Sequence, residues 1–111
     1  MRDDIRVLVL GTGQMGAGIA RLLVVKPGLK LVGAFARRTE RAGMDVGAAI
    51  DLGRDLGITV GVELAALIER AQPDIAIQAT CSRIVDAMGE ITMLARHGVH
   101  VISIAEEMAV S

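Results

Sequence analysis

The chain has 111 residues, of which 52% are apolar, with one Phe and neither Trp nor Tyr. That length suits one domain, residues 1–111, with a core of Val, Ile, Leu, Ala and Met side chains. The 12 basic and 13 acidic residues give a net charge of −1, which argues against nucleic acid or a lipid surface as a partner. The single cysteine, Cys81, excludes an internal disulfide and a thiolate metal cage, and we expect no metal site.

The first apolar run ends in glycines after a few residues, which is too short for the apolar region of a secretory signal. No window approaches the roughly 18 apolar residues that a membrane-spanning helix needs. We therefore expect a cytoplasmic protein that does not contact membranes.

The first 36 residues predict a strand, a glycine turn, a helix and a second strand. The apolar run Ile5–Leu10 is typical of a buried strand. Gln14–Val25 follows as a helix, and a second apolar run over residues 29–36 is again of strand length. Four apolar residues recur at helical spacing in that helix: Met15, Ile19, Leu22 and Leu23. The whole unit has the size of a βαβ motif, whose two strands are parallel.

The remaining chain predicts the same alternation. In order, we expect a short helix within 45–56, a strand at 58–60, a helix at 63–71, a strand at 75–80, a helix from 82 or 83 to 97 and a strand at 99–104. The helix at 63–71 carries Leu64, Leu67 and Ile68 on one face. The helix after residue 82 carries Ile84, Met88, Ile91, Leu94 and Ala95. Gly98 supplies a left-handed helix end. Regular alternation of strand and helix predicts a doubly wound parallel sheet with helices on both faces, a three-layer α/β/α arrangement.

The turn after the first strand, GTGQMG at residues 11–16, matches the G-x-G-x-x-G pattern of dinucleotide-binding Rossmann domains. The pattern alone is weak, but a buried strand precedes it and an amphipathic helix follows. Gly11 would permit the tight turn, Gly13 the approach of a pyrophosphate, and Gly16 the close packing of helix on strand. Thr12, Gln14 and Met15 would supply backbone N–H donors at the positive end of the helix dipole. The alternative is a turn that merely joins strand to helix.

The end of the second strand bears on which cofactor is bound. NAD-binding domains place an acid about 20 residues after the first glycines, where it bonds a ribose 2′-hydroxyl. Here Arg37, Arg38 and Thr39 stand at that point. An arginine fork bonds a 2′-phosphate, so the sequence predicts NADP(H), with NAD possible. A solvated surface pair of arginines is the alternative.

The later strand ends offer further candidates at the same edge of the sheet. Ala79 and Thr80 could line the channel for the nicotinamide ribose, or form a plain strand-to-helix turn. Glu106 and Glu107 could hold an ammonium group or act as general acid and base, or could simply favour a helix N-terminus. Cys81, His97 and His100 are each better explained as structural or exposed residues than as catalytic ones.

Several segments together resemble the N-terminal domain of the 2,4-diaminopentanoate dehydrogenase and native amine dehydrogenase family, which is built like dihydrodipicolinate reductase. They are VLVL–GTGQMG, the DLG turn at residues 51–53, the AT pair at 79–80 and HVISIAEEM at residues 100–108. The resemblance covers nearly the whole chain, and the SIAEEM segment is its most specific part.

This resemblance implies an oxidoreductase acting on CH–NH2 groups, either by reductive amination of a ketone or by oxidative deamination of an amine or diamino acid. It implies that Glu106 or Glu107 binds the amine nitrogen of the substrate. It also implies a second, C-terminal domain that covers the substrate and mediates dimer contacts. We expect that domain to be absent from this chain, the chain alone to be nearly inactive, and the protein to be a homo-oligomer. Two alternatives stay open: a dihydrodipicolinate reductase-type imine reductase domain, and a stand-alone nucleotide-binding module without catalysis.

Overall fold

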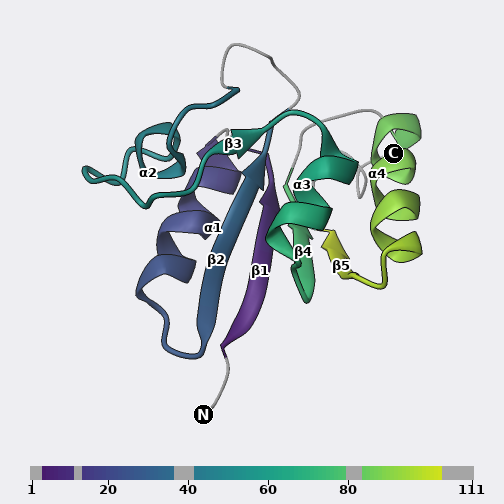
Figure 1. Cartoon of the computed structure of the whole chain (residues 1–111), viewed down its shortest axis with the longest axis horizontal. Helices are drawn as coiled ribbons and strands as arrows, with labels where there is room; N and C mark the ends of the chain where they lie inside the picture. The colour runs from purple at the N-terminus through teal and green to yellow at the C-terminus, as the bar shows by residue number, and fades with distance from the viewer. Residues whose placement is uncertain (1–3, 12–13, 37–41, 80–83, 104–111) are drawn as a thin grey trace.

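A computed structural model describes residues 4–11, 14–36, 42–79 and 84–103 of the chain (Figure 1). Strands and helices alternate, as the sequence predicts, and most lie within two residues of the expected bounds. The elements are β1 (Ile5–Leu10), α1 (Gln14–Val25), β2 (Leu29–Phe35), α2 (Val46–Ala49), β3 (Val60–Gly61), α3 (Leu64–Ala71), β4 (Ile75–Gln78), α4 (Ile84–Arg96) and β5 (His100–Ser103).

The five strands form one parallel sheet in the order β3-β2-β1-β4-β5. The chain starts at the central strand, β1, and builds outward through β2 and β3. It then crosses back to the other side of β1 and adds β4 and β5 (Figure 1). The direction of winding therefore reverses between β1 and β4, which makes that position the topological switch point of a doubly wound sheet.

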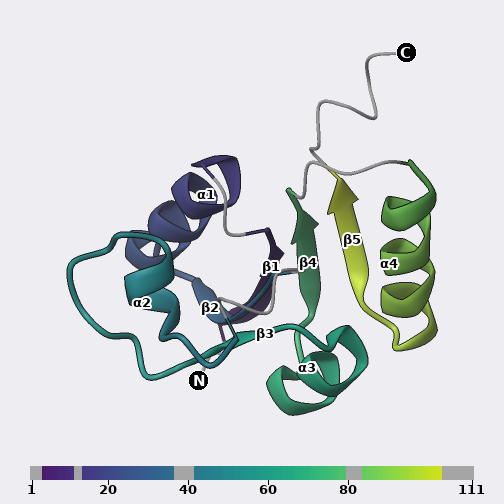
Figure 2. The ribbon, with the colours of Figure 1, turned by 90° about the horizontal axis from the view of Figure 1, so that it is seen from above.

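Helices cover both faces of the sheet, and β1 contributes to the core on each side. Val7 and Val9 belong to a cluster that also holds buried residues of α1 and Val46 of α2. Leu8 and Leu10 belong to a second cluster, with buried residues of α3 and α4. Figure 2 shows α1 and α3 on opposite sides of the sheet. The predicted three-layer α/β/α architecture is confirmed.

The buried faces of two helices do not follow from apolar spacing alone. In α1 the buried residues include the small Ala17 and Ala20 as well as Leu23, whereas Leu22 is 58% exposed. The small side chains of Ala17 and Ala20 let the helix lie close to the strands, and a leucine at either of these two positions would hold it away. In α4, Met88 is 54% exposed, whereas Glu90 and Leu94 are buried. Apolar spacing, in which Leu22 and Met88 take part, therefore does not by itself identify the buried face of either helix.

A carboxylate organises the segment between α2 and β3. Asp45 caps α2 by accepting a hydrogen bond from the amide of Gly47 at 2.7 Å. It also accepts from the amides of Leu56 at 2.8 Å and Gly57 at 2.9 Å, so one side chain closes a loop of a dozen residues. These amides, with that of Leu56 contributing most, hold the pKa of the Asp45 carboxyl below its usual value because they stabilise the charged form.

The guanidinium of Arg6 ties β1 to the end of α3. Its Nε donates to the carbonyl oxygens of Ala71 at 3.2 Å and Gln72 at 3.0 Å. These carbonyls close α3, where Gln72 adopts a left-handed conformation with φ of 51°. The cation thus satisfies carbonyl groups that a helix end leaves without an intrahelical donor.

Across the described part of the chain, no helix combines the length and the apolar character that crossing a membrane would require.

Candidate dinucleotide site

The carboxyl ends of four strands lie side by side at one edge of the sheet. Leu10 at the end of β1 pairs with Phe35 of β2 on one side and with Gln78 of β4 on the other. Gln78 in turn pairs with Ser103, the last residue of β5. Ligands of open parallel sheets bind outside this edge, at the point where the winding reverses. Each segment with a predicted site residue follows one of these four strand ends.

The glycine turn leaves β1 at the switch point. Gly11 is buried, has a φ of 113° and donates its amide to the carbonyl of Phe35 at 2.7 Å. This φ lies in a region that residues with a Cβ rarely adopt. A Cβ added to Gly16 would overlap the Gly11 carbonyl oxygen and lie 2.7 Å from its carbonyl carbon. Two of the three glycines therefore have the stereochemical roles that the sequence assigns to them.

Helix α1 begins at Gln14, directly after that turn. Its first backbone N–H groups have no acceptor within the helix, and the helix dipole adds a partial positive charge at the same place. An anion at this corner would meet both contributions, which is the arrangement that holds a pyrophosphate in Rossmann domains. The predicted site residues Thr12 and Gly13 lie outside the described residues.

The end of β2 is fixed where the chain reaches the arginine pair. Phe35 and Ala36 are buried, and the Ala36 amide donates to the carbonyl of Gly61 at 3.0 Å. The following residues, Arg37, Arg38 and Thr39, lie outside the described part. The segment that carries them therefore starts at the edge of the sheet beside Gly11.

The end of β4 is tied directly to β1. The amide of Ala79 donates to the Leu10 carbonyl at 2.8 Å, and Ala79 is buried. This places the start of the segment that carries Thr80 and Cys81 next to the glycine turn. Thr80 and Cys81 lie outside the described residues, as do Glu106 and Glu107.

A polar cluster with two buried members lies beneath this edge, and we did not predict it from the sequence. Gln78 is fully buried and Glu90 is 7% exposed. The Gln78 Nε2 donates to Oε1 of Glu90 at 2.8 Å, and the Ser103 Oγ donates to Oε1 of Gln78 at 2.9 Å. A signal was present in the sequence, since Gln78 ends an otherwise apolar strand and Glu90 stands four residues before the buried Leu94.

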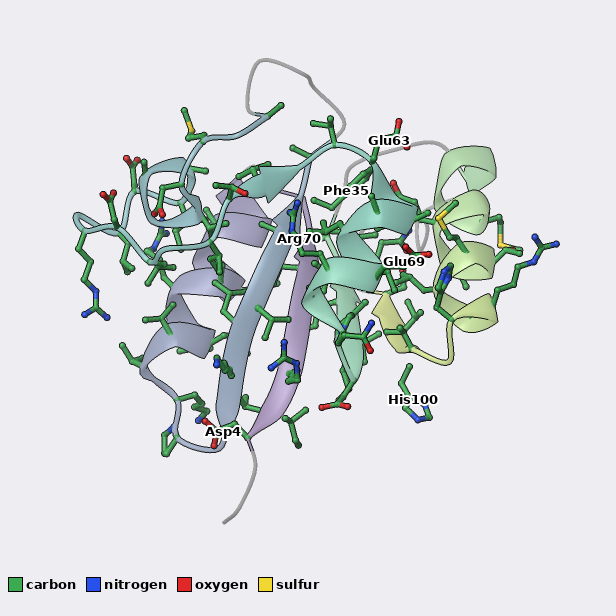
Figure 3. The ribbon with its side chains drawn as sticks, viewed as in Figure 1. Asp4, Phe35, Glu63, Glu69, Arg70 and His100 are labelled. Atoms are coloured by element: carbon green, nitrogen blue, oxygen red, sulfur yellow. The ribbon has the colours of Figure 1, made fainter. Side chains whose placement is uncertain are left out.

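The two histidines lie away from this edge. His97 is exposed, and its Nδ1 contacts the carbonyl oxygen of Met93 at 2.9 Å. His100 begins β5, and Figure 3 shows it at the end of the molecule opposite Phe35. No group of three potential metal ligands occurs within the described ranges. The expectation that both histidines are structural or exposed agrees with these positions.

A parallel sheet that reverses at β1, with the Gly11–Gly16 contact at the switch point, defines an α/β domain of the Rossmann type. Residues 5–104 match the family model described as dihydrodipicolinate reductase, N-terminus. The chain belongs to this family.

Two relatives agree with the resemblance seen in the sequence. The chain is 30% identical over 108 residues to 2,4-diaminopentanoate dehydrogenase of Acetoanaerobium sticklandii, covering 96% of this chain and 30% of that protein. It is 37% identical to the amine dehydrogenase of Mycobacterium smegmatis, whose structure superimposes with a TM-score of 0.83 over 96% of this chain and 31% of that one. The chain thus spans about 30% of the length of these relatives, and the resemblance to their N-terminal domain is confirmed.

A more distant structure shares only the fold. RSP, solved in complex with β-NADH, is 20% identical, with a TM-score of 0.67 over 96% of this chain and 56% of that one.

Proposed function

We propose that residues 1–111 bind a nicotinamide dinucleotide, NADP(H), as the cofactor-binding domain of an oxidoreductase that acts on CH–NH2 groups. The observation that carries this proposal is the contact between Gly16 and the Gly11 carbonyl at the switch point of the sheet. Close contact of the helix with the turn brings the first amides of α1 toward the position of a pyrophosphate. The relatives named above are dehydrogenases, and RSP carries β-NADH on the same fold.

The preference for NADP(H) over NAD rests on Arg37, Arg38 and Thr39. They follow the end of β2, where a dinucleotide places its adenosine ribose. A guanidinium bonds a 2′-phosphate with two parallel N–H groups, whereas the ribose 2′-hydroxyl of NAD is usually read by a carboxylate. None of these three residues is acidic.

A direct titration tests both parts of the proposal. The chain lacks Trp and Tyr, so the fluorescence of a reduced nicotinamide can be followed without interference from the protein. We expect the affinity for NADPH to be at least about tenfold higher than that for NADH, because one charge-assisted hydrogen-bonded pair contributes about that much to binding. Replacing Arg37 and Arg38 by Ala should remove this difference, whereas the exposed Arg54→Ala should keep it. Tighter binding of NADH would overturn the assignment of NADP(H), and binding of neither would overturn the cofactor site.

The bound cofactor would supply or accept the hydride that interconverts an amine and an imine. In this proposal Glu106 or Glu107 holds the amine nitrogen through the negative charge of its carboxylate, and Ala79 and Thr80 border the nicotinamide ribose. The support is the resemblance of the SIAEEM segment to the dehydrogenase family. A substrate domain outside residues 1–111 would close the site and exclude water, so these residues alone should turn over slowly.

The family match supports a second candidate, reduction of a cyclic imine in the manner of dihydrodipicolinate reductase. Both activities would use the same cofactor edge and differ in the substrate. Assays of a polypeptide that includes the substrate domain, with amines and ketones in one set and a cyclic imine in the other, distinguish them. Turnover of the cyclic imine alone would favour this second candidate.

A further inference from the structure

Gln78, Glu90 and Ser103 form a polar cluster beneath the site edge, in which Gln78 and Glu90 are buried and Ser103 is exposed. Each comes from a different element. Gln78 ends β4, Ser103 ends β5, and Glu90 lies within α4. Among the residues described, the buried polar or charged side chains are Gln78 and Glu90, and they are bonded to each other. A polar pair in an otherwise apolar core is costly to bury unless its hydrogen bonds are made.

The hydrogen bonds of the cluster run in one direction. Ser103 donates to the amide oxygen of Gln78, and the amide nitrogen of Gln78 donates to the carboxylate of Glu90. The amide oxygen and the amide nitrogen of Gln78 thus each make a hydrogen bond within the cluster, and these two bonds help to fix the orientation of the amide. Polar groups that are satisfied in this way hold a single geometry better than an apolar contact does.

The cluster sits where two segments of the proposed site begin. Residues 79–83 follow Gln78 and residues 104–107 follow Ser103. In a doubly wound sheet the first half, here β1 and β2, receives the adenosine nucleotide, and the half beyond the switch point receives the other nucleotide. The strands that the cluster links, β4 and β5, belong to that second half.

We propose that Gln78, Glu90 and Ser103 are positioning residues that fix the ends of β4 and β5 for the nicotinamide half of the dinucleotide. They do not touch the reacting atoms but act through the segments that follow them. This inference rests on the proposed function. It predicts an effect on the nicotinamide half that is separable from binding of the adenosine half.

The test compares two ligands on three forms of the chain. NADPH spans both halves of the site, whereas 2′-phospho-ADP-ribose lacks the nicotinamide ring. Calorimetry would give the dissociation constant of each ligand for the wild type, Glu90→Leu and Glu90→Gln. Glu90→Leu removes the carboxylate that accepts a hydrogen bond from Gln78, and Glu90→Gln keeps an oxygen in that place. Thermal melting of all forms checks that they are folded.

We expect Glu90→Leu to lower the affinity for NADPH by about fivefold, which corresponds to the free energy of one hydrogen bond. The affinity for 2′-phospho-ADP-ribose should change by less than about twofold. Glu90→Gln should restore most of the NADPH affinity. If Glu90→Leu does not fold, Ser103→Ala, at an exposed position, should give a smaller loss in the same direction.

Three results would overturn this proposal. The first is an equal loss of affinity for both ligands, which a general loss of protein stability would produce. The second is an unchanged NADPH affinity in the folded variants. The third is equal affinity of the wild type for both ligands, since the nicotinamide would then make no contact for the cluster to position. A wild type that binds neither ligand would instead show that the proposed function itself is wrong.

Discussion

The carbonyl group of Gly11 occupies the space that a Cβ at position 16 would need. The two residues lie on either side of the turn between β1 and α1, and their contact sets how closely the helix approaches the end of the central strand. A single added methyl group would force the turn and the helix apart. The geometry of the proposed pyrophosphate site therefore depends on an atom that is absent.

The first prediction concerns this contact. Gly16→Ala should destabilise the domain by about 1–3 kcal/mol, the usual result of overpacking. It should also weaken dinucleotide binding by about tenfold or more, because the first amides of α1 move. Gly18→Ala is the matched control, since a Cβ there has only the Arg21 side chain within 4 Å, at 3.9 Å. Chemical denaturation and calorimetry would measure both effects, and equal behaviour of the two variants would contradict this account.

The second prediction concerns pH. The pKa of Asp45 is lowered in the folded state by backbone amides, that of Leu56 first. A carboxyl with a lowered folded pKa stabilises the protein above its unfolded pKa, and this contribution is lost as the pH falls through the lower folded pKa. The contribution of Asp45 should therefore be complete at neutral pH and decline below about pH 4.

Asp45→Asn provides the test. The two carboxylate oxygens of Asp45 accept hydrogen bonds from three backbone amides, whereas the side chain of Asn has only one oxygen that can accept. The variant should melt at a lower temperature than the wild type at pH 7, and the difference should shrink as the pH is lowered. Asp55→Asn, at an exposed position in the same loop, serves as the control. A difference between Asp45→Asn and the wild type that grows toward acid pH would show that the assigned sign is wrong.

The third prediction concerns Arg6, whose guanidinium donates to the carbonyls of Ala71 and Gln72. Arg6→Met keeps the apolar stem but leaves these carbonyls without the cation, and should cost about 1–2 kcal/mol of unfolding free energy. Urea titration would measure the loss, with the exposed Arg54→Met as control. Dinucleotide affinity should be unchanged, because Arg6 lies away from the carboxyl edge. A stability equal to that of the wild type would mean that water replaces the guanidinium without loss.

The fourth prediction concerns self-association. β5 is the last strand in the sheet order, and its Ile102 is 49% exposed. An exposed apolar residue on a terminal strand favours contact with a second copy. Sedimentation should show reversible association of the wild type and a shift toward monomer in Ile102→Lys. Leu22→Lys, at a residue 58% exposed on α1, should leave the association unchanged, and a wild type that stays monomeric at high concentration would refute the idea.

The sequence was sufficient to predict the order of the elements, because apolar runs and glycine stops mark nearly every boundary. It also predicted the glycine corner, where Gly11 and Gly16 have clear stereochemical roles. It did not identify the buried face of α1, because apolar spacing favours the larger Leu22 whereas close packing selects Ala17 and Ala20. Helical spacing alone does not show how near a helix lies to its sheet.

The hydrogen-bond pairings within the polar cluster could not be predicted, for a different reason. Gln78 and Ser103 are 25 residues apart, and only the parallel register of β4 and β5 makes them neighbours. Glu90 is of a type common in exposed helices, so its residue type alone did not indicate burial, and only its helical spacing to Leu94 did. Long-range pairings of this kind follow from the topology and not from local sequence patterns.

The alternation of side chains along β1 has a consequence for how this domain can change over evolutionary time. The strand separates the packing of Val7 and Val9 on one face from that of Leu8 and Leu10 on the other. Volume lost by a substitution in one cluster can be compensated by residues of the same cluster, without adjustment across the sheet. The helices on the two sides can therefore diverge at different rates while the edge that joins them keeps its shape.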